Sequence, residues 1–257
     1  MSWAAKRKLS YALVVLVILG IAAFGVYKSS FSKPATCFDG KQDQDETGVD
    51  CGGNICALRC TSDISPIVSL WDPRLFNVDN GVYTAAVMVE NPNGTSGAKA
   101  VPFSLKIYDA TDTDVVIKEI DDTVDVYPGE EFPIIETGIS TGKRLPGRVV
   151  LTFNENAVEW YKEAPLATPV KTLAPTVTNE ATAPLVTASA LNDSSSAADN
   201  VDIVAVVSDK DGNAIGASRT FIQHMDPHQS VPIYFTWPVP FSEPIAQVEL
   251  YPKVLGD

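Results

Sequence analysis

The sequence predicts an all-β protein in which two β-sandwiches follow one N-terminal transmembrane helix and a small disulfide-stapled segment. Three observations lead to this prediction. Residues 9–27 form an uncharged apolar run, all four cysteines lie within residues 37–60, and the later chain alternates short apolar strands with turn residues. The predicted segments are a cytoplasmic tail (1–8), a transmembrane helix (9–27), a linker (28–36), a Cys-rich segment (37–60), a first sandwich (61–162), a linker (163–170) and a second sandwich (171–257).

The apolar run LSYALVVLVILGIAAFGVY, residues 9–27, has the length of a membrane span. As a helix it extends roughly 28 Å, close to the ~30 Å hydrocarbon core of a bilayer. Lys6, Arg7 and Lys8 precede it, which favours a cytoplasmic N-terminus and an extracytoplasmic remainder. The alternative is a cleaved signal peptide, but the run is longer than the ~7–15 apolar residues typical of one. We therefore expect a retained single-pass anchor in the cell membrane.

Charge is partitioned in the same way along the chain. All 32 acidic residues and 16 of the 19 basic residues follow the apolar run, which gives the predicted exterior a net charge of −16. A strongly acidic exterior repels nucleic acids and anionic lipid headgroups. Nucleic acid is therefore excluded as a partner, and solubility alone is a sufficient reason for the charge.

The four cysteines are Cys37, Cys51, Cys56 and Cys60, in the spacing C-x13-C-x4-C-x3-C. Outside the cytoplasm thiols become disulfides, and two of them would hold a segment that is too short to bury a core. A zinc site is the alternative, although the C-x2-C pairs and nearby histidines typical of zinc are absent. Four cysteines allow three pairings, and the spacing does not choose between them.

Five carboxylates in the same segment form a candidate calcium site. Hard oxygen donors within 12 residues suit calcium, although the spacing differs from that of an EF-hand. The alternative is a solvated acidic loop whose Asp and Gly residues form turns. No other cofactor is indicated. The candidate ligands are Asp39, Asp43, Asp45, Glu46 and Asp50.

The stretch CFDGKQDQDETGVDCGG, residues 37–53, resembles a C-x-DG…ETG-x-DCGG element of bacterial surface proteins. In those proteins the element often stands beside a membrane anchor or β-sandwich domains. The resemblance covers this segment alone. It implies an extracytoplasmic stapled module rather than an enzyme.

Alternating apolar residues predict the strands of both sandwiches. Because side chains on a strand point alternately to opposite faces, each alternating set should line one face of a sheet and form the core. The clearest sets are Tyr83, Ala85, Val87 and Val89; Phe103, Leu105 and Ile107; Val149, Leu151 and Phe153; Val201, Ile203, Ala205 and Val207; and Val248 and Leu250.

The two halves repeat at an offset of about 100 residues. The stretch 89–114 aligns with 190–213, Asp109 falls on Asp209, and the turn 127–130 falls near 226–229. About 100 residues is the length of an immunoglobulin-like sandwich, so the sequence predicts two such units in tandem.

The second unit, with ALNDSSSAADNVDIVAVVSDKDGN followed by a Pro turn, resembles the FxLYD family of extracytoplasmic β-sandwiches. The first unit, with VENPN and FSLKIYDA, resembles the same family or the related type 2 late-embryogenesis-abundant sandwich. Together these resemblances cover most of residues 62–257. They imply a fold and no catalytic residues.

Aromatic and histidine residues offer further candidates for a site. Trp71, Trp160 and Trp237 would form either a sugar-stacking face or part of the core, and the strand patterns around the last two favour the core. His224 and His228 stand beside an Asp-Pro turn, which favours exposed turn histidines over a helical metal site.

These features together predict a non-catalytic, membrane-anchored extracytoplasmic protein that acts as a structural or binding module. The expected partners are the membrane through residues 9–27 and another envelope protein, surface protein or glycan. Binding is expected in the loops around Asn91, Asn93, Asn192 and Asp193, because loops on a rigid sandwich carry recognition. The alternatives are an accessory subunit of a pilus or secretion machine and a carbohydrate-binding adhesin.

Overall fold

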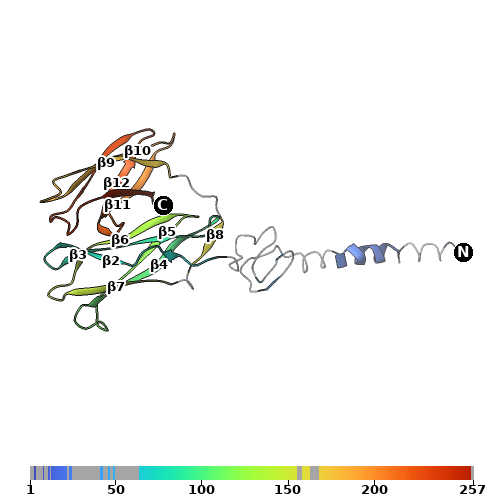
Figure 1. Ribbon diagram of the computed structural model, residues 1–257. Helices are drawn as coiled ribbons and strands as arrows, with labels where there is room; N and C mark the ends of the chain where they lie inside the picture. Colours follow the sequence, from blue (N-terminus) through green and yellow to red (C-terminus); the bar gives the residue numbers. More distant parts are fainter. Residues whose placement is uncertain are drawn as a thin grey trace. The chain divides into compact units, whose positions relative to one another are not determined.

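The computed structural model describes residues 64–154, 158–162 and 168–255, and in the N-terminal part residues 3, 8, 11, 13–21, 23–24, 41–42, 46 and 49 (Figure 1). The chain divides into two compact units, Met1–Thr61 and Ser62–Asp257. The second unit is all-β and contains several antiparallel sheets, as the sequence predicts.

In the N-terminal unit, residues 13–21 are helical. Among the residues that the structure describes, no helix combines the length and the apolar character needed to cross a membrane. Several residues of the predicted transmembrane segment 9–27, including residues 25–27, lie outside the described part, as does the whole linker 28–36.

Among the described residues between 64 and 162, eight strands form the first sandwich, which has two facing sheets. In one sheet β3 lies between β6 and the strands β1 and β2, and in the other β4 lies between β5 and the strands β7 and β8. All pairs are antiparallel. The strands are β1 (Val68–Ser69), β2 (Arg74–Asp79), β3 (Val82–Glu90), β4 (Ser96–Asp109), β5 (Val116–Val126), β6 (Glu131–Ser140), β7 (Pro146–Phe153) and β8 (Trp160–Lys162).

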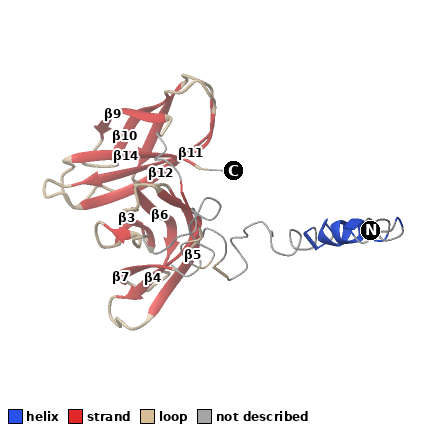
Figure 2. Ribbon diagram, turned by 90° about the vertical axis from the view of Figure 1, so that its right-hand side faces the viewer, coloured by secondary structure: helices blue, strands red, loops and turns tan. Residues whose placement is uncertain are grey.

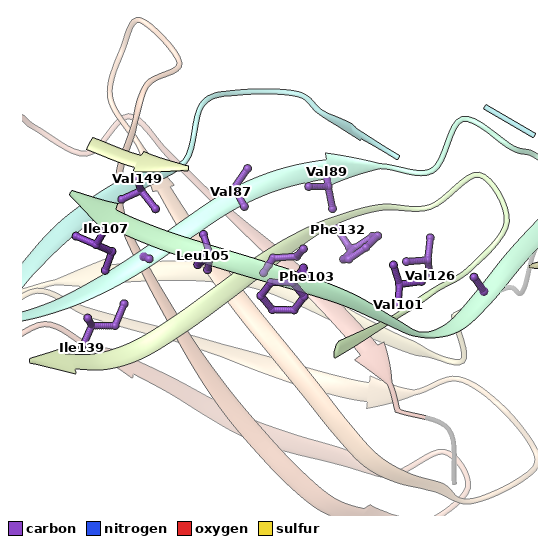
Figure 3. Packing of buried hydrophobic residues seen from close by; sticks show 13 residues of the cluster. Val87, Val89, Val101, Phe103, Leu105, Ile107, Val126, Phe132, Ile139 and Val149 are labelled. Carbon is purple, nitrogen blue, oxygen red and sulfur yellow. The ribbon is translucent and has the colours of Figure 1, made fainter. Parts of the chain in front are cut away.

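The core of the first sandwich lies between these two sheets. Figure 3 shows Val87 and Val89 of β3 together with Phe103, Leu105 and Ile107 of β4 among the buried side chains. The Phe103 and Phe153 rings meet edge-on, with centroids 6.5 Å apart. The three alternating sets predicted within residues 83–89, 103–107 and 149–153 all contribute to this core, because each places one apolar face of a strand against the opposite sheet.

Within the described range 168–255, six strands form the second sandwich, in the sheet orders β13-β10-β9 and β12-β11-β14. Its core contains the predicted set Val201, Ile203, Ala205 and Val207, with Val248 and Leu250 packed against it. The strands are β9 (Val170–Thr178), β10 (Leu185–Asn192), β11 (Ala198–Ser208), β12 (Ala214–Met225), β13 (Ser230–Thr236) and β14 (Gln247–Val254).

The four sheets of the second unit lie in successive layers (Figures 1 and 2). The sheet of β11, β12 and β14 faces the sheet of β2, β3 and β6, and β12 contacts all three strands of that sheet. As a result, β3 is buried on both of its faces, since residues 84–89 are all buried. A strand covered on both sides needs a continuous apolar run rather than alternation, and AAVMV (85–89) is such a run.

Candidate functional site

The predicted loop residues Asn91 and Asn192 occupy equivalent places in the two sandwiches and are fully buried. The Asn91 side-chain amide donates to the carbonyls of Ser96 (2.7 Å) and Tyr127 (2.8 Å). The Asn192 amide donates to the carbonyls of Ser196 (2.8 Å) and Asp226 (3.0 Å). Each asparagine therefore ties together two loops at one end of its sandwich, and neither side chain reaches the surface.

The other two predicted loop residues lie nearer the surface. Asn93 is partly exposed and bridges to the backbone of Ser65, donating from Nδ2 to the carbonyl (2.8 Å) and accepting from the amide (2.8 Å). Asp193 is exposed and pairs with the Lys171 ammonium. This ion pair lowers the pKa of Asp193.

The two sandwiches share one turn geometry, at residues 127–130 and 226–229, beside each asparagine loop. The Glu130 carboxylate accepts from the Tyr127 amide (3.1 Å), and the Gln229 side chain accepts from the Asp226 amide (2.7 Å). The residue before each acceptor has a left-handed backbone, with φ of 64° at Gly129 and 58° at His228. The predicted alignment of residues 127–130 with 226–229 is therefore confirmed residue by residue.

The aligned residues Asp109 and Asp209 also have one role. Each carboxylate caps the turn that follows its strand, accepting from the amide two residues later, at 2.8 Å from Thr111 and at 2.9 Å from Asp211. Hydrogen bonds from Thr111 lower the pKa of Asp109, and hydrogen bonds from Asn213 lower the pKa of Asp209. Both aspartates serve the turns of the fold.

The contact between the two sandwiches is the most elaborate arrangement among the described residues. Its centre is a third hydrophobic cluster, separate from the two sandwich cores. Ala86, Met88 and Ile135 from the first sandwich pack there against Val204, Val206, Ala214 and Ala217 from the second. Trp71, Phe76 and Tyr251 lie at its margin.

Lys253 of β14 crosses this contact to reach the first sandwich. Its ammonium donates to the Glu130 carboxylate (2.8 Å) and to the Asp125 carbonyl (2.6 Å), and it lies 3.9 Å from the centre of the Phe132 ring. The side chain is only 12% exposed. Burial lowers the pKa of Lys253, and the attraction of Glu130 offsets part of that effect. The Tyr127 hydroxyl adds a bond to the Val254 carbonyl (3.0 Å).

A second group of charges lies at the same contact. Arg219 donates from Nε and Nη2 to the two oxygens of Asp202, at 3.2 and 3.1 Å, which is a bidentate pair. Burial nevertheless raises the pKa of Asp202. Burial also raises the pKa of Glu136, and the neighbouring Asp122 carboxylate adds to that rise. The carboxylates of Asp202 and Glu136 are therefore partly removed from water, which disfavours their charged form.

A cleft of about 770 Å³ opens on another side of the contact, between β2 and β7 of the first sandwich and the start of β12 with the 237–242 segment of the second. Arg74 spans it, donating to the Ala214 carbonyl (3.0 Å) and to Asn213 Oδ1 (3.1 Å). Arg148 lies on its rim, with the guanidinium 4.0 Å from the centre of the Tyr108 ring. Aromatic residues supply much of the wall, namely Phe76, Tyr83, Trp237 and Phe241.

The candidate residues Trp160 and Trp237 lie in or against the sandwich cores, as the strand patterns favour. Trp237 is buried in the core of the second sandwich, Trp160 packs against the core of the first, and Trp71 is partly exposed. Both histidines are exposed, as predicted, but His224 lies within β12 rather than in the turn. Its Nδ1 lies 2.5 Å from Asp199 Oδ1, and this hydrogen bond raises the pKa of His224.

Of the residues predicted to form disulfides or to bind calcium, the structure describes Glu46 alone. Cys37, Cys51, Cys56 and Cys60, and with them Asp39, Asp43, Asp45 and Asp50, lie outside the described residues. Glu46 is described and buried, and its carbonyl accepts from the Gln42 side chain (3.0 Å). Among the described residues, no three Cys, His, Asp or Glu side chains are grouped to hold a metal ion.

Comparisons with known proteins place the chain in no family. No family model and no curated protein matches it. Among solved structures, the red sea bream transglutaminase is similar at 11% identity and a TM-score of 0.23, over 73% of this chain and 32% of that one. A β-glucuronidase from glycoside hydrolase family 2 is similar at 12% identity and a TM-score of 0.23, over 69% and 24% of the two chains. The chain therefore spans less than a third of either protein, and likenesses at this TM-score support no inference about activity.

Proposed function

We propose that this protein is a non-catalytic, single-pass membrane protein that holds two packed immunoglobulin-like sandwiches outside the cytoplasm as one recognition module. The N-terminal run 9–27 is its anchor. The segment 37–60 is a disulfide-stapled stalk with Asp39, Asp43, Asp45, Glu46 and Asp50 as candidate calcium ligands. The second sandwich is of the FxLYD type, the first is of the same type or of the type 2 late-embryogenesis-abundant type, and the partner is an envelope protein, a surface protein or a glycan.

The contact between the two sandwiches is the observation that supports the proposal most directly. Two domains joined only by a linker would reorient freely, whereas a buried apolar cluster and a buried Lys253–Glu130 pair favour one fixed arrangement. A fixed arrangement suits a module that must present one surface at a set distance from the membrane. The acidic exterior and the apolar N-terminal run support the membrane placement.

The membrane topology is tested with the full chain carrying a C-terminal epitope, in intact bacterial cells. Protease added outside should remove the epitope from intact cells. An epitope that survives until the cells are lysed would overturn the proposed orientation.

The stalk is tested by native mass spectrometry of the protein purified under oxidising conditions. A mass lower by four hydrogens is expected for two disulfides, and an increment that EDTA removes is expected for calcium. Substituting Asp43, Asp45 and Asp50 by Asn should abolish any stabilisation by calcium. Four free thiols would contradict the extracytoplasmic placement of the segment.

The fixed arrangement is tested with Lys253→Met. Removing the ammonium leaves the Glu130 carboxylate, which is 20% exposed, with the Tyr127 amide as a donor but without its cation. We expect a loss of about 2–3 kcal/mol in the free energy of unfolding and a larger radius of gyration by X-ray scattering. Lys210→Met is the matched control, because Lys210 is 82% exposed and pairs only within its own turn.

An accessory subunit of an envelope machine is the second candidate. Crosslinking on intact cells separates the two, since only a machine subunit should give stoichiometric products with other membrane proteins.

A further inference from the structure

The cleft between the sandwiches has the size and lining of a ligand site. Its volume of about 770 Å³ lies within the 300–1,000 Å³ typical of small-molecule sites. Both sandwiches contribute to its wall, so the cleft exists only while they stay packed together. It combines aromatic surface with a small number of polar side chains at the rim, which is the usual composition of a binding site.

A buried donor without a protein acceptor lies in the wall of this cleft. Trp237 is 5% exposed, and no protein atom accepts a hydrogen bond from its Nε1. The Phe241 ring packs edge-on against the indole, with centroids 5.2 Å apart. Buried indole N–H groups usually find an acceptor, and no protein group uses this one, so it is available to an acceptor on a ligand.

Gly216 creates the space for this aromatic pair. A Cβ at this position would lie 2.4 Å from Phe241 Cε1 and 3.2 Å from Trp237 Nε1. Phe241 is partly exposed at the cleft, while Trp237 is held by the core behind it. Phe241 packs against the edge of that core, so a rotation of its ring would change the cover of the indole and leave the buried centre of the core in place.

The polar side chains at the rim narrow the ligand class. Asn77 and Arg148 line the cleft, are exposed and carry planar hydrogen-bonding groups. The Arg148 guanidinium lies over the Tyr108 ring and donates to the Thr113 carbonyl (3.3 Å), which leaves further N–H groups for a ligand. Planar amides and guanidinium groups bond well to adjacent hydroxyls, and aromatic faces pack on the C–H faces of a sugar ring. An anionic ligand would meet the field of a chain with net charge −13, which disfavours it.

We propose that this cleft binds a neutral oligosaccharide. A sugar oxygen accepts from Trp237 Nε1 after Phe241 turns aside, a sugar ring packs against the aromatic wall, and Asn77 and Arg148 bond to hydroxyls at the rim. This proposal rests on the proposed function in one respect, because it needs the fixed contact between the sandwiches.

The test is titration calorimetry on the full chain in phosphatidylcholine nanodiscs, which avoids sugar-based detergents. The probes are the hexaoses of β-1,4-linked glucose, N-acetylglucosamine and mannose, with decaproline as the probe for an extended peptide. We expect one hexaose to bind with 1:1 stoichiometry. Trp237→Phe, which keeps an aromatic ring and removes the N–H, should weaken binding about 3- to 10-fold.

Asn77→Ala provides a second variant, because an exposed position tolerates the change without unfolding. Asn77→Ala should weaken binding of the same hexaose by a similar factor. Asn80 is exposed and lies outside the cleft, so Asn80→Ala should leave binding unchanged. The absence of binding by all three hexaoses at millimolar concentration would overturn the proposal. Binding of decaproline alone, or hexaose binding that both variants leave unchanged, would also overturn it.

X-ray scattering on the same samples separates this proposal from the proposed function. A compact pair of sandwiches that binds none of the hexaoses contradicts the cleft proposal alone. A scattering profile of two separated sandwiches contradicts the fixed arrangement itself.

Discussion

The outer faces of the two sandwiches differ at equivalent positions of the repeat. On β4 and β5, Lys106 and Glu119 are cross-strand partners, lie in solvent and form an ion pair of 3.0 Å. The equivalent partners on β11 and β12 are Val206 and Ala217, and each is 3% exposed. The antiparallel pairing of β4 with β5 matches that of β11 with β12. The side chains differ, so the first pair faces water and the second faces the neighbouring sandwich.

In the other sheet of each sandwich the contrast is reversed: the outer face is buried in the first sandwich and exposed in the second. Ala86 and Ile135 are cross-strand partners of β3 and β6 and are buried in the contact. The equivalent partners in the second sandwich are Thr187 and Tyr234, and Tyr234 is 58% exposed. Each sandwich therefore has one apolar outer face, and these two faces meet. Polar outer faces close both ends of the stack, as capping units do in repeat proteins.

Exchanging the outer-face residues should have the largest effect. Val206→Lys copies the residue of β4 into the contact and places an ammonium against Ala86 and Met88. We expect a loss of about 3 kcal/mol or more in the free energy of unfolding, because the charge is buried without a partner. Denaturant unfolding and X-ray scattering measure the loss and the separation of the sandwiches. The reverse change, Lys106→Val, should leave the contact intact, and an unchanged Val206→Lys protein would refute the comparison.

The buried asparagines test what the two sandwiches share. Asn91→Ala and Asn192→Ala should each cost about 2–4 kcal/mol, because each change leaves several buried backbone groups without a partner. Hydrogen exchange should show the loss mainly in the sandwich that carries the change. Asn80→Ala in an exposed turn is the control and should stay within about 0.5 kcal/mol. A large difference between the two variants would show that the loops are not equivalent.

The pH dependence should distinguish the contact from the turns. The pKa of Glu136 is raised by burial, so the folded state favours its protonated form, and its contribution to stability is lost as pH rises through the raised pKa. Asp109 and Asp209 have lowered pKa values, so their contribution is lost when pH falls below the ordinary range of an aspartate. Glu136→Gln should therefore raise Tm by about 2 °C at pH 7 and have little effect near pH 4. Thermal scans from pH 4 to 8 measure this, and a lower Tm at pH 7 would contradict it.

The smallest effect concerns the shared turn. His228 adopts a left-handed backbone where the first sandwich has Gly129. His228→Gly should therefore stabilise by about 0.5–1 kcal/mol, and Gly129→Ala should destabilise by about 1 kcal/mol. A Cβ at 129 would meet its nearest neighbour at 3.6 Å, so the expected cost is conformational rather than steric. Denaturant unfolding of both variants checks the opposite signs.

The candidate site was only partly predictable. The sequence indicated the repeat and the asparagine loops, but it assigned Asn91 and Asn192 to binding, because a loop asparagine that turns inward has the same local pattern as one that points outward. Lys253 and the cleft were missed. A lysine in a strand normally faces solvent, and only the neighbouring sandwich buries this one. The signal available was the unbroken apolar runs 85–89 and 203–207, which indicate strands covered on both faces.

The all-β class, the core face of each predicted strand, the repeat and the turns at Asp109 and Asp209 can all be read from the amino-acid sequence. These features depend on the two-residue period of a strand and on side chains that bond to their own turn, and both are local. Only the tertiary structure decided which outer faces meet, which lysine is buried and where the cleft opens. Those outcomes depend on surfaces more than 100 residues apart in the chain, as the hydrogen bonds of Lys253 to Asp125 and Glu130 show. Local patterns carry no information about the partner that such a surface will find.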